Sequence, residues 1–376
     1  MAQHCDVTVL TRSKRKPAID AYLAAHKIDT LHFKYLDLPA LLRRMLGVQL
    51  YYYMWQCAAV IKCRLLHRKH SFDVVHHVTL GRYWTWSACA FSGAKFLWGP
   101  VGGGESAPPQ FEPGFGISGM LTERFRRAAR WLGEHDPFFR IALARSACAI
   151  AVTRETATRL RAHNASRIEL ISHVALNRKE ISDLAACSTP PSGITRFVSI
   201  GRLLCWKGFH LALEAYARAR IANSEYWIIG DGPDMTRLKA IALQLNLKKS
   251  AIFKGQIPRT EVLAALSQCH VLLHPSLHES GGWVCAEAMA AARPVICLNL
   301  GGPAEIVPDS AGIKIDANSP AKAIADMAEA MNALAADSNM LARMSADAQK
   351  HAAQNLCWEE KAVRIKALYQ HISEAE

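Results

Sequence analysis

The chain has 376 residues, of which 51% are hydrophobic and 20% are charged. This composition excludes a disordered protein, and the length suffices for two domains with buried cores. Lysine and arginine total 45 against 32 acidic residues, a net charge of +13 that favours anionic partners such as nucleotide diphosphates, acidic lipid surfaces or nucleic acid. The 11 cysteines have no CxxC spacing, which argues against a zinc site or a disulfide framework and favours a reducing cytoplasm.

Apolar segments alternate with helical segments along the chain, which is typical of parallel α/β architecture. In the first half we expect strands at residues 7–10, 31–35, 74–78, 95–98, 148–152 and 168–171. Helical stretches are expected between them, including an arginine-rich stretch over residues 121–144. Its arginines are consistent with a solvated face, or with docking to anionic lipid or a pyrophosphate-linked acceptor.

A long uncharged run covers residues 45–61, between Arg44 and Lys62. It contains Gln49 and Gln56 and is shorter than the ~20 apolar residues that a membrane span requires. We therefore expect a helix packed against a sheet. A membrane-surface helix is the second interpretation, because basic residues flank the run, and a membrane span is the third.

A run of glycines follows the fourth expected strand. Gly102, Gly103 and Gly104 permit close approach of the backbone to a ligand, and Glu105 comes directly after them. Because the run lies at the carboxyl end of a strand, we predict a binding loop rather than a flexible surface loop. His77 ends another expected strand and is a further candidate for this cleft, although a buried structural histidine is an equal interpretation.

The second half has expected strands at residues 197–200, 226–229, 251–254, 271–274, 295–298 and 312–315. Residues 185–193 have linker composition, and helices are expected from about residue 320 to the end. We therefore predict two α/β domains that are divided near residue 185.

Two carboxylates, Glu279 and Glu287, flank a glycine pair just after one of these strands. We expect a loop through Gly281 and Gly282, followed by a helix that begins near Trp283. Backbone N–H groups at such a helix start bind phosphate, and glycine lets the phosphate approach closely. The carboxylates would then accept hydrogen bonds from hydroxyls on either side of the phosphate, as in a nucleotide sugar. The alternative is a solvated loop glutamate and a helix-start glutamate that complements the helix dipole.

Arg202 and Lys207 follow the expected strand at 197–200, at the edge where α/β sheets bind ligands. A diphosphate leaving group needs positive charge in the transition state, which these two side chains can supply. The alternative is a pair of solvated surface cations.

Four ordered elements resemble retaining glycosyltransferase family 4, whose members have the GT-B fold of two Rossmann-like domains. They are Gly201-Arg202-Leu203 with Lys207-Gly208, then Gly230-Asp231-Gly232-Pro233, then the Glu-x7-Glu pair Glu279 and Glu287, and finally Gly301-Gly302-Pro303-Ala304-Glu305, which resembles the loop that closes the donor site. Two positions and one segment depart from the family. It usually has an aromatic residue where Gly281 stands, a glycine where Ala292 stands, and Pro-Asn-Gly-Val-Asp in place of residues 172–177.

The resemblance implies a role for each candidate residue. Arg202 and Lys207 would bind the diphosphate and stabilise the leaving nucleotide. Glu279 would hold hexose hydroxyls, and Glu287 would hold the ribose. The other donor-binding residues would be Gly201, Gly208, Gly230, Asp231, Gly232, Ser280, Gly281, Gly282 and Trp283, and the acceptor-side candidates are Gly102, Gly103, Gly104, Glu105 and His77.

The resemblance also implies a division of the chain. Residues 1–185 would form the acceptor-binding domain, residues 186–355 the nucleotide-sugar-binding domain, and residues 356–376 a helix that packs back on the first domain. Compared with the family, about one βα unit is missing before the strand at 7–10.

The function implied is transfer of a hexose, with retention of configuration, from a UDP- or GDP-hexose to a polysaccharide or lipid-linked glycan. No metal or other cofactor and no nucleic acid is implied, and the location would be the cytoplasm, either free or at the inner membrane face. A crippled nucleotide-sugar-binding protein with an incomplete acceptor domain is the alternative. The charge alone would also suit a nucleic-acid-binding protein, but the basic residues are spread out and match no binding motif. The Glu-x7-Glu pair argues against a sugar epimerase of the same fold.

Overall fold

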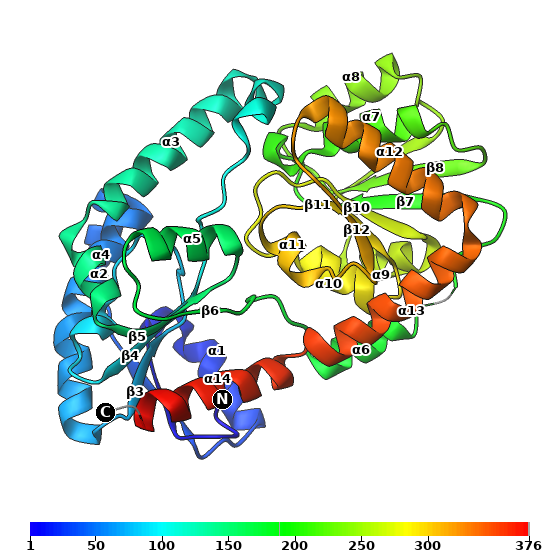
Figure 1. Cartoon of the computed structure of the whole chain (residues 1–376). Helices are drawn as coiled ribbons and strands as arrows, with labels where there is room; N and C mark the ends of the chain where they lie inside the picture. The colour runs from blue at the N-terminus through cyan, green and yellow to red at the C-terminus, as the bar shows by residue number, and fades with distance from the viewer. Residues whose placement is uncertain (188, 375–376) are drawn as a thin grey trace.

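The computed structural model describes residues 1–187 and 189–374. Figure 1 shows two α/β lobes, one from each half of the chain, and all their strand pairings within the described residues are parallel. The predicted α/β fold with two Rossmann-like domains is confirmed. Ser188 of the expected linker and residues 375–376 of the expected C-terminal segment lie outside the described residues.

The first lobe holds two parallel sheets. Its strands are β1 (Val7–Thr11), β2 (Leu31–Tyr35), β3 (Val74–His77), β4 (Lys95–Val101), β5 (Ser146–Ala151) and β6 (Ile168–Leu170). β1 pairs with β2, and the other four pair in the order β3-β4-β5-β6. The helices are α1 (Lys16–Ala25), α2 (Ala40–His70), α3 (Gly116–Glu134), α4 (Pro137–Ala144) and α5 (Arg154–Ala162), with 3-10 turns at Ser13–Arg15, Ala88–Phe91 and Pro109–Phe115. β4 and β5 form the centre of the core, where Trp98 and Ala149 are fully buried.

The helical stretch expected over residues 121–144 is helical apart from one break, which divides it into α3 and α4. Pro137 has no backbone N–H to continue a helix. Asp136 instead caps α4, since its carboxylate accepts a hydrogen bond from the Phe138 N–H at 2.8 Å. The break frees α3 to run as a separate arm from the first lobe toward the second (Figure 1).

The uncharged run at 45–61 lies within α2. The helix is broken at Gly47, whose φ is 67°. Its later turns pack on the core of the first lobe through Ala59 and the buried Gln56. Gln56 accepts a hydrogen bond from the Ala88 N–H at 2.9 Å. Among the described residues, no helix is both long enough and apolar enough to cross a membrane.

The second lobe is one six-stranded sheet in the order β12-β11-β10-β7-β8-β9. The strands are β7 (Thr195–Ile200), β8 (Ser224–Ile229), β9 (Ala251–Gly255), β10 (Val271–His274), β11 (Val295–Leu298) and β12 (Gly312–Ile315). The helices are α6 (Arg178–Ala185), α7 (Phe209–Ala219), α8 (Met235–Gln244), α9 (Arg259–Gln268), α10 (Trp283–Ala290), α11 (Gly301–Ile306), α12 (Pro320–Ala336) and α13 (Ser338–Asn355), with a 3-10 turn at Cys205–Lys207. Tyr226 and Ile228 face one buried cluster and Trp227 and Ile229 the other, so helices cover both faces of the sheet.

Residues 301–305, which were expected to form a loop, open the helix α11 instead. Pro303 suits the first turn of a helix, where its missing N–H would have no partner. The Gly301 N–H donates to the Glu155 carboxylate of the first lobe at 2.8 Å. This helix start is therefore one of the contacts between the lobes.

The last helix, α14 (Trp358–Glu374), returns to the first lobe (Figure 1). Leu368 and Ile372 pack against Leu97 and Ile150 of the central strands. The Tyr369 hydroxyl lies 2.7 Å from His76 Nδ1 at the edge strand β3. The functional division at residues 185/186 and 355/356 stays a prediction.

Candidate functional site

The loop that leaves β10 places a carboxylate against a lysine. The Lys207 ammonium forms a close ion pair with the Glu279 carboxylate, and these side chains are 21% and 20% exposed. Burial raises the pKa of Glu279, but Lys207, His274 and the Gly281 amide outweigh it, so the pKa lies below its ordinary value. Glu279 is therefore ionised at neutral pH and still accessible to a ligand.

The second carboxylate of the motif, Glu287, lies on α10 and is 8% exposed. Its Oε1 accepts a hydrogen bond at 2.5 Å from Arg259, the first residue of α9. Burial raises the pKa of Glu287 even though Arg259 acts in the opposite sense. Arg259 is half exposed, so a ligand hydroxyl can displace it from Glu287 without burying the guanidinium.

The two glycines of the motif shape the start of α10. Gly282 is the N-cap with φ of 98°, and no side chain among the described residues caps this helix. Its first N–H groups thus keep the capacity to bind an anion. Trp283 is 40% exposed at the first helical position, and Ser280 donates to a carboxylate of the first lobe.

The predicted glycines of the β7 and β8 loops serve close backbone packing. Gly230 has φ of 136°, and a side chain there would overlap the Gly201 carbonyl. Gly232 lies against the backbone of Leu203, and its N–H donates to the Asp231 carboxylate at 2.7 Å. These contacts fix the loops that border the ion pair of Lys207 and Glu279.

Two further donor-side predictions lie at the same sheet edge. Gly208 caps α7 with φ of 70° and packs on Pro275. Arg202 is exposed, and within the described residues no ion pair joins it to Glu279 or another carboxylate. The structure therefore brings Lys207 to Glu279 but leaves Arg202 at the rim.

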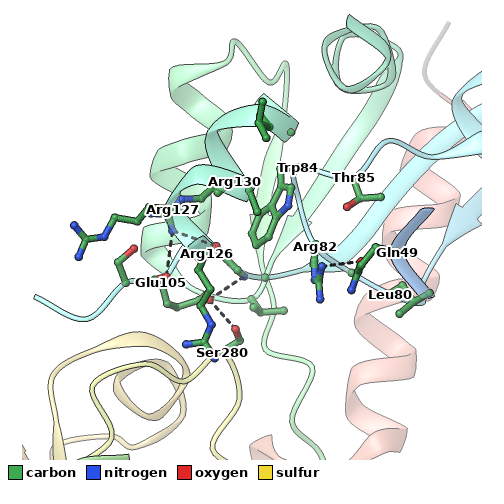
Figure 2. Close-up of a pocket in the computed structure, with 18 of the residues that line it drawn as sticks. Gln49, Leu80, Arg82, Trp84, Thr85, Glu105, Arg126, Arg127, Arg130 and Ser280 are labelled. Carbon is green, nitrogen blue, oxygen red and sulfur yellow. Dashed lines mark hydrogen bonds between the residues drawn. The ribbon is translucent and has the colours of Figure 1, made fainter. Parts of the chain in front are cut away.

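The glycine run of the first lobe is organised around Glu105, which is 3% exposed. Its carboxylate accepts hydrogen bonds from the Gly103 N–H at 2.8 Å and from the hydroxyls of Thr153, Thr156 and Ser280 at 2.5, 3.0 and 2.6 Å. Burial raises the pKa of Glu105, but the hydroxyl donors, Ser280 first, bring it below its ordinary value. Because Ser280 belongs to the second lobe, Glu105 ties the glycine run to the motif loop (Figure 2).

A cavity of about 940 Å³ lies beside this tie. Its walls come from α2, the loop after β3, the glycine run and α3, and Figure 2 shows Arg82, Trp84 and Ser280 among them. Gly102, Gly103 and Glu105 line it, and His173 and His278 reach it as well. Its mixture of aromatic, polar and basic walls suits a sugar-bearing ligand.

Most cationic groups of this cavity have protein partners. Arg126 pairs with Glu123 at 2.7 Å, and Arg127 forms a close ion pair with Glu112. Arg130 donates to the carbonyl oxygens of the glycine run, of which that of Glu105 lies at 3.2 Å. These arginines hold the walls in place, which differs from the solvated helix face that was one interpretation of the sequence.

The candidate His77 is not among the residues that line the cavity. Its Nε2 lies 3.0 Å from the Tyr52 hydroxyl, and burial lowers its pKa to about 4. The structural interpretation of this histidine thus describes its surroundings better than a ligand contact does.

Sequence reasoning missed two residues of the site. His173 reaches Gly281 from the segment between β6 and α6, and Arg259 reaches Glu287 from the start of α9. The only signal for His173 was the unusual sequence of residues 172–177. Arg259 had the weaker signal of a basic residue after the carboxyl end of a strand.

The sequence is similar to those of known glycosyltransferases. Residues 188–351 match the family model described as glycosyl transferases group 1. A 2-deoxystreptamine glucosyltransferase of Streptomyces kanamyceticus is 25% identical over 72% of this chain and 70% of its own length. A D-inositol 3-phosphate glycosyltransferase of Corynebacterium efficiens is 30% identical, but over 47% of this chain and only 43% of its own length.

Solved structures give the fold. Anabaena HepE in complex with UDP superposes with a TM-score of 0.64 at 16% identity, over 97% of this chain and 99% of that one. The same protein with UDP and glucose gives a TM-score of 0.60. The prediction of a glycosyltransferase enzyme is confirmed by the match over residues 188–351 and by these glycosyltransferase relatives. Residues 188–351 therefore match the model of glycosyl transferases group 1, within a chain that has the two-lobed GT-B fold.

Proposed function

We propose that the protein is a retaining glycosyltransferase that moves a hexose from a nucleotide sugar to a glycan acceptor. The observation that carries this proposal is the ion pair of Lys207 and Glu279 beside the start of α10, next to the cavity of the first lobe that Ser280 and His278 also line. The glucosyltransferase name of the Streptomyces relative supports the reaction. UDP and glucose bound to HepE support a uridine donor rather than a guanosine donor.

In this proposal the donor lies along the carboxyl edge of the second sheet. Lys207 and the first N–H groups of α10 bind the diphosphate, and the exposed Arg202 swings onto it from the rim. Glu279 accepts hydrogen bonds from hexose hydroxyls. Glu287 releases Arg259 and accepts hydrogen bonds from the ribose hydroxyls. This exchange is possible because Arg259 is half exposed and can turn to solvent.

Positive charge drives the departure of the nucleotide. As the glycosidic bond breaks, negative charge develops on the diphosphate and is stabilised by Lys207, Arg202 and the helix N-terminus. The acceptor hydroxyl attacks the anomeric carbon from the face of the departing phosphate, and its proton passes to the phosphate oxygen. Glu279 is assigned to sugar binding because its carboxylate is held by Lys207. We propose a reaction without metal, since these groups supply the charge.

The acceptor in this proposal is a polysaccharide or a lipid-linked glycan bound in the cavity. Apolar side chains stand exposed on the two helices that wall it, including Met45 of α2 at 71% and Phe125 of α3 at 75%. The basic Arg44 is exposed beside Met45. Exposed apolar and basic side chains on these two helices suit an amphiphilic acceptor at the inner face of a membrane.

We further propose that the two sheets of the first lobe flank an unfilled strand position, which lies between β1 and β3. Within the described residues, β1 pairs only with β2, and β3 pairs only with β4. All residues of β1 and β3 are half-buried, whereas most of β5 is fully buried. Two parallel edges of this kind are what a doubly wound sheet presents when one central strand is absent, in agreement with the βα unit that the family resemblance implies.

Thermal unfolding with nucleotides tests the donor site. UDP, GDP, ADP and their hexose conjugates are compared on the wild-type protein and on Glu287→Ala. A ligand at a hundred times its Kd adds about 2.7 kcal/mol of stability, which raises Tm by about 2–4 °C. We expect such a shift with the uridine compounds and its loss in Glu287→Ala. A shift that survives the substitution unchanged, or none with any nucleotide, would contradict the proposed site.

A further inference from the structure

A histidine from the segment that joins the lobes lies at the centre of the proposed site. His173 lies between β6 and α6, and its neighbours Val174, Ala175 and Leu176 are fully buried. Leu176 pairs with Cys357 of the returning chain as an isolated parallel bridge, and the Lys361 ammonium donates to the Ser172 carbonyl. Because the segment is fixed on both sides, the imidazole is held in place rather than free to turn away.

The imidazole occupies the space beside the motif loop. A β-carbon built on Gly281 would lie 3.2 Å from His173 Nε2 and 3.5 Å from its Cε1. On its other side the ring packs edge-on against Trp283, with centroids 6.4 Å apart at 69°. The glycine at position 281 is thus the residue that makes room for this histidine, which accounts for the missing aromatic residue there.

The hydrogen-bonding capacity of the ring is unused. His173 makes no hydrogen bond among the described residues, and its Nδ1 is buried without a partner. Burial and the Lys361 ammonium lower the pKa of His173, against the pull of the carboxylates Glu105 and Glu279, so the ring is neutral at pH 7. A buried N–H without an acceptor is costly. The ring proton therefore belongs on Nε2, on the side of Gly281.

We propose that His173 is a substrate-contacting residue whose Nε2–H donates a hydrogen bond to a hydroxyl of the transferred hexose. The assignment rests on the proposed function, because it needs the hexose to lie between Glu279 and the Gly281 amide. His173 also lines the cavity with Glu105 and Ser280, so the hydroxyl that it holds is on the side where the acceptor approaches. The ring would orient the hexose for transfer and discriminate between hexoses that differ at that hydroxyl.

Calorimetric titration separates the hexose contact from nucleotide binding. UDP, UDP-glucose, UDP-galactose and UDP-N-acetylglucosamine are titrated into the wild-type protein, His173→Ala and His173→Gln. For the sugar nucleotide that binds best, His173→Ala should raise Kd about three- to tenfold, the loss of one neutral hydrogen bond, while Kd for UDP changes less than about twofold. Glutamine keeps an N–H donor at similar reach and should restore most of the affinity.

The variant Gly281→Ala tests the contact between His173 and Gly281 independently. Its β-carbon would press on Nε2, so it should weaken sugar-nucleotide binding in the wild-type background and have little further effect beside His173→Ala. An equal loss of affinity in both backgrounds would indicate that the new β-carbon presses on Val174, whose Cγ2 would lie 3.3 Å from it. That result would overturn the assignment.

The outcomes distinguish the two proposals. One outcome overturns the role of His173 but not the proposed function. In that outcome the wild-type protein binds the sugar nucleotide, and both His173 variants bind UDP and the sugar nucleotide as tightly as the wild type does. An equal loss for UDP and the sugar nucleotide also overturns it, since that result indicates a structural role. If the wild-type protein binds none of the four compounds, the proposed function fails together with the assignment.

Discussion

At the scale of single residues, the site is governed by how many hydrogen bonds each carboxylate accepts. Glu279 pairs with Lys207 and lies near His274, Glu287 pairs with Arg259, and both carboxylates keep capacity for ligand hydroxyls. Glu105 is saturated, with four donors on two oxygens, so it is a structural tie rather than a base. Three glutamates in one site thus have different roles because their neighbours differ.

Glu105→Gln tests this difference. The amide keeps the shape of the side chain but replaces one acceptor with a donor, which leaves at least one buried hydroxyl or N–H without an acceptor. We expect a loss of about 1–3 kcal/mol in the free energy of unfolding, measured with urea. Ser280→Ala is the control, because it removes only the bond between the lobes and should cost less than about 1 kcal/mol. Equal losses in the free energy of unfolding of the two variants would refute the role of Glu105 as a saturated structural carboxylate.

At the scale of elements, strands were predictable where a short segment is apolar, as in β10 and β11, or alternates apolar residues with others, as in β2 and β12. β2, β10, β11 and β12 begin and end at the predicted residues for this reason. β4 extends to Val101, beyond its predicted end, because Val101 pairs with Ala151 after a shift in register that no local pattern indicates. His173 and Arg259 were missed because tertiary packing, and not sequence spacing, brings them to Gly281 and Glu287.

Amide hydrogen exchange tests the unfilled position in the first sheet. The outer edges of β1 and β3 should exchange rapidly in the present chain, whereas β4, which is paired on both sides, should be protected. Protection of both edges equal to that of β4 would contradict the proposal.

At the scale of the whole molecule, both lobes bury neutral histidines. Burial lowers the pKa of His76, His77, His210 and His274 to about 4. The unfolded chain binds protons at these residues near pH 6.5, whereas the folded chain does so only near pH 4. Their contribution to stability is therefore complete above pH 6.5 and is lost as the pH falls from 6.5 toward 4.

Urea unfolding between pH 7 and pH 5 measures this loss. Each histidine should contribute a slope of up to about 1.4 kcal/mol per pH unit in the free energy of unfolding. His210→Gln should reduce the total slope by about one such increment. A stability that is independent of pH in this range would show that these histidines are not buried in neutral form.

The central claim is that this two-lobed chain transfers a hexose with retention of configuration. The most direct measurement is proton NMR of the sugar released from α-linked UDP-glucose, by transfer to a glycan or slowly to water, with the wild-type protein and Lys207→Ala compared. We predict that the α-anomer forms first, and that Lys207→Ala slows release about 10²–10³-fold, as expected for loss of a group that stabilises transition-state charge. Release of the β-anomer first, or a rate that Lys207→Ala leaves unchanged, would contradict the account.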